Sequence, residues 1–235
     1  MTMGSIHLIG GGWDEPEVYR PFVEAAGPLP RIACVVLDEG DGQVQFARWA
    51  SVLRELAPCQ PVPVLVPVGS RLSVHQLGSA DGLLVCGGLT PAYAAALAPA
   101  AAALRDWLAD RPYCGFSAGA AIAASRAVVG GWRDGELEVC PEDSAEDIDQ
   151  VRVVDGLGLV DLMVDVHCAQ WGTLPRLVAA LGPSGRGVGL DENTALQFVD
   201  GEVTVTGLGA AHHVVVADGE ARVRTYRSGS RLPSG

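Results

Sequence analysis

Short apolar runs alternate with helix-like segments through the first half of this chain. The runs that predict strands are 6–9, 31–37, 62–68 and 82–86, and the segments that predict helices are 15–26, 44–56 and 91–108, with a break near Pro99. Every side chain from position 32 to position 37 is apolar, as in a strand that is covered on both faces. The alternation predicts an α/β fold in which a mostly parallel central sheet carries helices on both faces.

The second half of the chain is less regular. Strand-like runs occur at 151–154, 157–160, 163–166, 187–191, 195–199, 202–206, 213–217 and 221–226, and a helix-like stretch covers 174–181. Turn dipeptides such as Asp200-Gly201 and Asp218-Gly219 separate the later runs, which predicts a C-terminal antiparallel extension. A chain of 235 residues, 49% of them hydrophobic, is expected to form a single domain over 1–235.

The charge balance narrows the classes of partner. The formal net charge is −12 at pH 7, which argues against nucleic acid and against anionic membranes and is compatible with a cationic substrate. The N-terminal residues lack a basic region, and every long apolar run is broken by glycine, proline or a charge. We therefore expect a cytoplasmic protein that acts on a small molecule, and the sequence leaves open whether it forms a homodimer.

Cysteines, histidines and glycines give no sign of a cofactor. The six cysteines include no Cys-x-x-Cys pair, and the five histidines are scattered, so we expect reduced thiols and no metal. The run Gly10-Gly11-Gly12 ends the first predicted strand. It lacks the Gly-x-Gly-x-x-Gly spacing and has no lysine beside it, which disfavours a nucleotide site.

The segment Gly115-Phe116-Ser117-Ala118-Gly119 has the pattern Gly-x-Ser-x-Gly between a predicted strand and a predicted helix. A serine on such a sharp turn is pushed out of the sheet, where its hydroxyl can act as a nucleophile. A tight glycine turn with a helix-capping serine is the alternative interpretation. Gly88 ends another predicted strand, so the backbone N–H groups of Gly88 and Ala118 are candidates for an oxyanion hole.

A serine nucleophile needs a base, and His167 is the best candidate. It follows the apolar run 162–166, which places it at the carboxyl end of a predicted strand, and a polar loop follows it. The other histidines lie inside strands or in a polar helix-like region. A structural role for His167 is the alternative.

Together these motifs resemble the dipeptidase E and cyanophycinase family of serine peptidases, within the class I glutamine amidotransferase-like superfamily. The matching segments are 6–12, 86–88, 115–120, 165–167, 176–177 and 187–196, in family order. The resemblance implies a flavodoxin-like α/β fold, Ser117 as nucleophile and His167 as general base. Amidotransferases carry cysteine at the elbow and a His-x-Glu pair, whereas this chain has Ser117 and Ala169 at those positions, which argues against glutamine hydrolysis.

In the peptidase family the third acid lies between the serine and the histidine in the chain. Asp134 and Glu136 fall in that region after Gly130-Gly131, and we favour Glu136 slightly. Either residue can instead be a solvated loop acid.

The resulting prediction is a serine hydrolase, a peptidase that cleaves small peptides or isopeptide-like amides through an acyl-enzyme on Ser117. The alternatives are a non-catalytic amidotransferase-like binding module and an esterase or amidase that acts on a non-peptide metabolite. Leu89, Pro91 and Trp171 stand where the family tends to carry polar or basic residues. They predict an apolar wall that prefers an uncharged acyl group and accepts α-aspartyl dipeptides and cyanophycin poorly.

Overall fold

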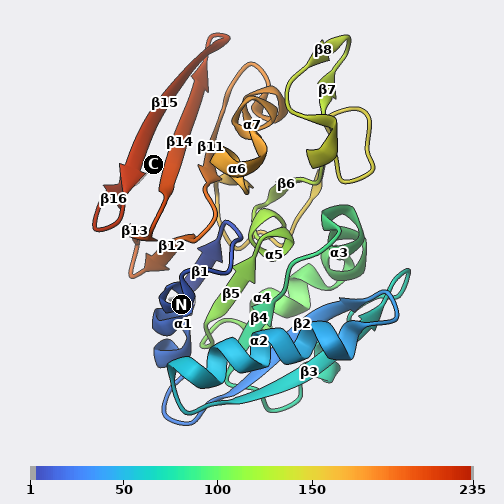
Figure 1. Ribbon diagram of the computed structural model, residues 1–235, viewed down its shortest axis with the longest axis vertical. Coiled ribbons are helices and arrows are strands. Elements are labelled where there is room, and N and C mark those ends of the chain that lie inside the picture. Colours follow the sequence, from blue (N-terminus) through green and yellow to red (C-terminus); the bar gives the residue numbers. More distant parts are fainter. Residues whose placement is uncertain (1–3, 234–235) are drawn as a thin grey trace.

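The computed structural model describes residues 4–233, and its centre is an eight-stranded sheet (Figure 1). The strand order is β16-β13-β12-β1-β5-β4-β2-β3. The five strands that pair in parallel are β1 (Ile6–Ile9), β2 (Arg31–Asp38), β3 (Gln60–Pro67), β4 (Gly82–Val85) and β5 (Tyr113–Phe116). The antiparallel side consists of β12 (Thr194–Val199), β13 (Glu202–Gly207) and β16 (Arg231–Leu232). The proline-containing strand β3 lies at the edge of the sheet, where a residue without a backbone N–H donor is tolerated.

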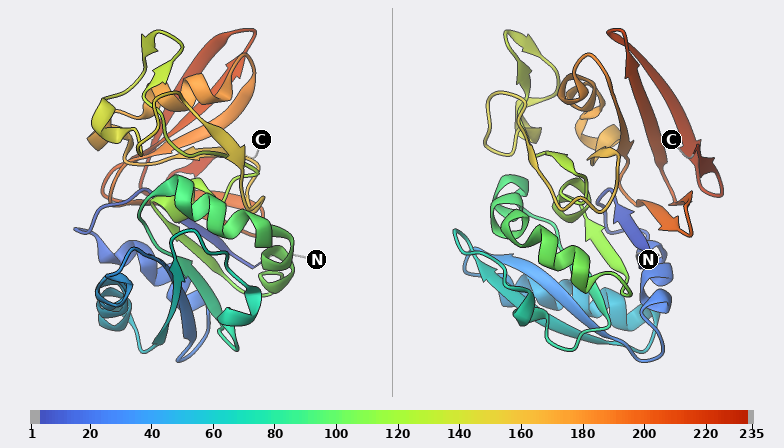
Figure 2. Two further views of the ribbon diagram at one scale, coloured as in Figure 1. Left: turned by 90° about the vertical axis from the view of Figure 1, so that its right-hand side faces the viewer. Right: turned by 180° about the vertical axis from the view of Figure 1, so that it is seen from behind.

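Helices cover both faces of the parallel part. The helices α1 (Arg20–Ala25) and α2 (Gly42–Leu56) pack on one face, after a 3-10 turn η1 (Pro16–Tyr19). On the other face lie η2 (Val74–Leu77), α3 (Thr90–Leu97), η3 (Ala98–Ala100), α4 (Ala101–Trp107) and α5 (Ala118–Ala121). Figure 1 shows α2 in front of the sheet, and the reverse view in Figure 2 shows the green helices in front. The predicted α/β class is confirmed.

Strand β2 shows why a continuous apolar run was needed. Its alternate side chains enter two separate cores: Ile32, Cys34 and Val36 belong to the core under α1 and α2. Ala33 and Val35 belong to the core under α3 and α4. Successive side chains of a strand point to opposite faces, so a strand between two helical layers must be apolar at every position.

A second sheet carries part of the C-terminal region. Its order is β10-β11-β14-β15, built from β10 (Met163–Asp165), β11 (Gly185–Leu190), β14 (Ala210–Ala217) and β15 (Glu220–Arg227). Helix α7 (Leu174–Leu181) packs on this sheet through Leu177 and Leu181. The later strands do pair in antiparallel fashion, but they divide between two sheets, because β12 and β13 join the central one.

The segment between residues 126 and 155 forms small local pairs beyond the carboxyl ends of the parallel strands. Its elements are β6 (Arg126–Val128), β7 (Arg133–Asp134), β8 (Leu137–Glu138), η4 (Glu142–Ser144) and β9 (Val153–Asp155). Strand β6 pairs with β9, and β7 with β8, in a hairpin that projects from the upper end of the molecule in Figure 1. The expected strand at 157–160 is absent there, apart from one bridge between Ala124 and Val160. Within residues 4–233 no helix is long and apolar enough to cross a membrane.

Candidate active site

Ser117 occupies a strained turn between strand β5 and helix α5. Its backbone angles are φ +51° and ψ −110°, a conformation that non-glycine residues rarely adopt. The flanking glycines make the turn possible. A Cβ on Gly115 would lie 2.4 Å from the Gly119 carbonyl, and a Cβ on Gly119 would lie 2.3 Å from the Val85 oxygen. The local sequence is therefore dictated by a close approach of backbone to backbone, as in a nucleophile elbow.

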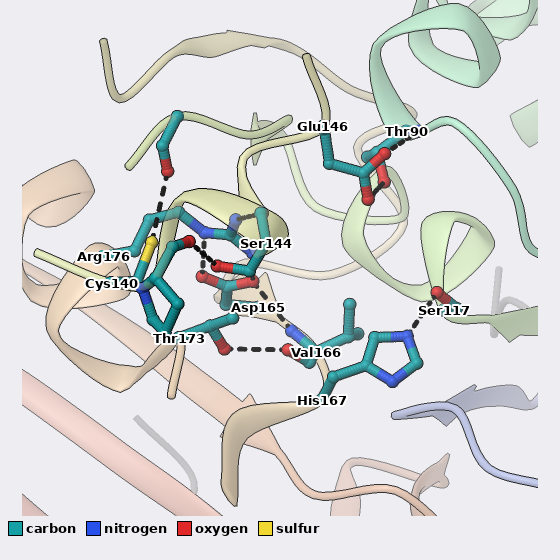
Figure 3. Close-up of polar contacts among 12 residues, drawn as sticks. Thr90, Ser117, Cys140, Ser144, Glu146, Asp165, Val166, His167, Thr173 and Arg176 are labelled. Atoms are coloured by element: carbon teal, nitrogen blue, oxygen red, sulfur yellow. Dashed lines mark hydrogen bonds and ion pairs between the residues drawn. The ribbon is translucent and has the colours of Figure 1, made fainter. Parts of the chain in front are cut away.

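His167 faces Ser117 from another sheet. It follows β10 after one intervening residue, Val166, has left-handed backbone angles (φ +54°, ψ +37°) and caps the start of the short helix α6 (Cys168–Trp171). Its Nε2 lies 2.8 Å from the Ser117 hydroxyl oxygen, and Figure 3 shows the two side chains pointing toward each other. The exposed fractions are only 7% for Ser117 and 6% for His167. The structure thus brings the predicted nucleophile and base into hydrogen-bonding contact.

The run Gly10-Gly11-Gly12 contacts His167 and helps to hold it in place. These contacts account for the run without a bound phosphate. The backbone N–H of His167 donates to the Gly10 carbonyl over 3.0 Å. A Cβ on Gly11, whose φ is +109°, would lie 2.1 Å from Cε1 of the His167 ring. Only glycine leaves space for the imidazole there.

The acid beside His167 is Glu192. Its Oε1 lies 2.7 Å from Nδ1 of the histidine, and its side chain is 25% exposed. This corrects the predicted third acid. Asp134 and Glu136 are exposed in the β7–β8 hairpin, whereas the turn after β11 brings Glu192 to the imidazole. Position between serine and histidine in the chain does not make a residue their neighbour in space.

The turn that carries Glu192 is fixed on several sides. The Asp191 carboxylate accepts backbone hydrogen bonds from Ala169 and Ala210, each over 3.0 Å, and pairs with His212 at 3.1 Å. Burial opposes ionisation of Asp191, but these donors outweigh it, so its pKa is lowered. The Glu192 N–H donates to the Gln170 side chain over 2.9 Å. The block Asp191-Glu192-Asn193-Thr194 carried part of the family resemblance, so the sequence did contain a signal for this acid.

The surroundings of His167 favour a neutral ring that can accept a proton. Burial is the largest influence and lowers the pKa of His167, while the hydrogen bond and charge of Glu192 act in the opposite direction. With the carboxylate of Glu192 as acceptor, the proton of the neutral ring belongs on Nδ1. Nε2 then carries a free lone pair toward Ser117. Serine, histidine and glutamate form one hydrogen-bonded chain with the polarity that general-base catalysis needs.

The predicted oxyanion donors are also close to the elbow. The loop after β4 runs past it, since a Cβ on Gly87 would lie 3.2 Å from Cβ of Ser117. Within residues 4–233 neither the Gly88 N–H nor the Ala118 N–H has a hydrogen-bond acceptor. Both are free to bind a developing negative charge.

A cavity of about 860 Å³ opens at Ser117. Gly88, Leu89 and Trp171 line it near the elbow. Much of the remaining wall is acidic, and the carboxylates that contribute to it are Glu39, Glu142, Asp143, Glu146, Asp147 and Asp149. The predicted apolar wall is therefore incomplete: Leu89 and Trp171 are in place, Pro91 is not among the lining residues, and six acidic residues also line the cavity.

The acidic segment 142–149 is attached to the rest of the protein by buried polar contacts. The Glu146 carboxylate accepts hydrogen bonds from the N–H and the hydroxyl of Thr90, each over 3.0 Å (Figure 3). Burial raises the pKa of Glu146, and the Thr90 donors partly oppose that rise. Arg176 donates to the Ser144 carbonyl and forms a bidentate pair with Asp165, at 2.9 and 2.7 Å. These contacts fix the segment 142–149, which forms much of the cavity wall, to the rest of the fold.

Comparisons with known proteins give matches in structure alone. No protein-family model and no curated protein matches the sequence. A peptidase from an acI-B1 Actinobacterium superposes with a TM-score of 0.66 at 17% identity, over 98% of this chain and 96% of that one. A protein from Listeria monocytogenes EGD-e, provisionally described as Peptidase E, superposes with a TM-score of 0.61 at 18% identity, over 88% of this chain and 100% of that one. At these identities the likeness shows a shared fold.

Proposed function

We propose that this chain is a serine-type peptidase that hydrolyses small peptides or isopeptide-like amides. The observation that carries the proposal is the continuous chain of contacts from Ser117 through His167 to Glu192, with distances of 2.8 and 2.7 Å. Its position at the mouth of a cavity supplies room for a substrate. The fold alone supports many activities, so the proposal depends on the site.

In the proposed reaction the Ser117 hydroxyl attacks the carbonyl carbon of the amide while its proton moves to Nε2 of His167. The N–H groups of Gly88 and Ala118 bind the resulting oxyanion, and Glu192 stabilises the imidazolium through Nδ1. The imidazolium then protonates the leaving amine, and the C–N bond breaks to leave an acyl-enzyme. Water, deprotonated by His167, attacks the ester, and the acid departs as Ser117 regains its proton.

Two further observations support hydrolysis over a binding-only role. Ser117 holds a strained backbone conformation, and such strain persists where the surroundings enforce it and is concentrated at functional sites. The two structural neighbours are both described as peptidases. A binding module with a purely structural serine needs neither the strained turn nor a histidine with a carboxylate behind it.

Labelling with a fluorophosphonate tests the proposal without knowledge of the substrate. The wild-type protein should gain one phosphonyl group on Ser117, located by peptide mass spectrometry, while Ser117→Ala and His167→Ala should gain none. Absence of label on folded wild-type protein would contradict the proposal and favour the binding module. Parallel panels of dipeptides, isopeptides and simple esters then distinguish a peptidase from an esterase or an amidase that acts on another metabolite.

A further inference from the structure

The indole of Trp171 lies flat against the imidazole of His167. The ring centroids are 3.8 Å apart and the planes differ by 9°. Trp171 is 39% exposed and lines the cavity, whereas His167 is buried beneath it. One face of the imidazole is therefore covered by an aromatic surface.

The chain places this contact through a single helical turn. Helix α6 begins directly after His167, and the backbone N–H of Trp171 donates to the His167 carbonyl over 2.7 Å. Residues four apart on a helix lie on the same side, so the indole falls over the imidazole. Gly172, with φ +67°, ends the helical turn. The buried hydroxyl of Thr173 then donates to the Val166 carbonyl over 2.8 Å, which ties the end of the turn to the residue before His167. The backbone that carries the histidine also fixes the indole.

The imidazole has two hydrogen-bonding partners and more distant charged neighbours. Glu192 contacts Nδ1 and Ser117 contacts Nε2. The more distant charges of Asp165 and Arg176 act in opposite directions on the ring's protonation. None of these groups contacts the ring face, which is where the π electrons of Trp171 lie. An indole face attracts a cation that lies within about 6 Å of its centroid.

We propose that Trp171 is a positioning residue that keeps the imidazole in the plane of Ser117 and Glu192 and stabilises its protonated form during proton transfer. The benefit to the reaction rests on the proposed function, because it requires His167 to accept the serine proton. The contact itself does not, so the two can be tested separately. The neutral ring gains only packing from the indole, whereas the imidazolium gains an electrostatic attraction as well.

Nuclear magnetic resonance titration of the His167 Cε1–H group tests the contact directly. The comparison uses wild type, Trp171→Phe and Trp171→Leu, with the His167 signal identified by its loss in His167→Gln. Leucine keeps an apolar cover over the ring but removes the π face, so Trp171→Leu should lower the pKa of His167 by about 0.4 to 1.5, with Trp171→Phe in between. An equal or higher pKa in Trp171→Leu would overturn the proposal.

Fluorophosphonate labelling of the same variants tests the effect on the reaction. Trp171→Leu should label about 2- to 30-fold more slowly than wild type at a pH where His167 is neutral, and Trp171→Phe should recover part of the rate. Trp107→Leu, in helix α4 away from the cavity, controls for the loss of a tryptophan as such. Equal rates in Trp171→Leu and wild type would refute the catalytic part of the inference. Failure of wild type to label would contradict the proposed function instead, and the titration would still decide the stacking.

Discussion

Glu192 decides which nitrogen of His167 is available to Ser117. A carboxylate on Nδ1 keeps the proton there and stabilises the ring when Nε2 accepts another. Glu192→Gln keeps the size of the side chain but allows its amide to donate to Nδ1, which favours the wrong tautomer. We expect kcat on a screened substrate to fall on the order of 10⁴-fold, as in other serine triads.

Two matched variants accompany this measurement. Asp134→Asn and Glu136→Gln change the acids that chain order suggested, both exposed in the β7–β8 hairpin, and each should leave kcat within about twofold of wild type. A large loss in either one, with normal activity in Glu192→Gln, would return the acid to the hairpin. The family resemblance included the block 187–196, which contains Glu192, but it implied an acid between Ser117 and His167 in the chain, so Glu192 was not predicted. The contact depends on where the turn after β11 meets the loop after β1.

The pH dependence of labelling follows from the state of His167. Only the neutral ring can take the Ser117 proton, so the labelling rate falls as pH drops through the pKa of this histidine. Burial lowers that pKa below the ordinary histidine value of about 6.5, so the loss of labelling on acidification should begin at a lower pH. Fluorophosphonate labelling rates measured between about pH 4 and 8 should therefore reach half of their plateau value at a pH below 6.5. A midpoint clearly above 6.5 would contradict this environment for the base.

Gly11 has a steric role that can be separated from its backbone conformation. Gly11→Ala would place a Cβ 2.1 Å from the His167 ring and should displace the imidazole from Ser117. Gly27 has nearly the same φ, +101° against +109°, but an added Cβ there meets nothing within 4 Å. Both variants should lose about 1 kcal/mol or more of unfolding free energy to backbone strain, and only Gly11→Ala should lose labelling. Equal labelling in the two variants would show that the imidazole does not depend on this space.

At the scale of elements, the site joins two sheets, and a buried ion pair connects β10, the strand that precedes His167, to helix α7. Asp165 at the end of β10 and Arg176 in α7 are 1% and 4% exposed. Removing one partner leaves the other charge buried, so Arg176→Met should cost about 3 to 5 kcal/mol of unfolding free energy, measured by urea denaturation. The double variant Asp165→Leu with Arg176→Met should recover part of the loss.

Arg186 provides the control for this measurement. It pairs with the exposed Asp161 over 3.0 Å, so Arg186→Met should cost less than about 1 kcal/mol. A similar loss of unfolding free energy in Arg176→Met and Arg186→Met would mean that burial of the Asp165–Arg176 pair does not increase its contribution to stability. Val166 also donates to Asp165, and Ser144 accepts from Arg176, so full recovery in the double variant is not expected.

The elements differ in how far local sequence determined them. Strand β2 was predicted over 31–37 and extends over Arg31–Asp38, because a strand between two cores has an unmistakable composition. The break near Pro99 was also found, where a 3-10 turn separates α3 from α4. The run 157–160 was apolar enough to predict a strand, yet only one bridge forms there. Which of the later strands join which sheet depends on long-range pairing, which no local pattern encodes.

At the scale of the whole molecule, part of the negative charge lies where a substrate would bind. The chain has a formal net charge of −12, and six carboxylate residues line the cavity beside Ser117. Two like charges about 4 Å apart repel by about 1 kcal/mol in water and about 4 kcal/mol near a protein surface. Two effects therefore weaken the binding of a negatively charged substrate: desolvation of its charge beside Leu89 and Trp171, and repulsion by the acidic residues of the cavity.

A pair of nearly isosteric substrates isolates the charge. Asn-X and Asp-X dipeptides have almost the same shape, so kcat/KM should favour Asn-X by about tenfold or more, which corresponds to about 1.4 kcal/mol. Raising the salt concentration from about 0.05 to about 0.5 M shortens the screening length and should narrow this ratio, because exposed carboxylates are screened most. A ratio that does not respond to salt would assign the discrimination to the apolar side chains, as the sequence alone suggested. Faster cleavage of Asp-X at low salt would contradict both explanations, since it requires a cation in the acyl pocket, and no arginine lines this cavity among residues 4–233.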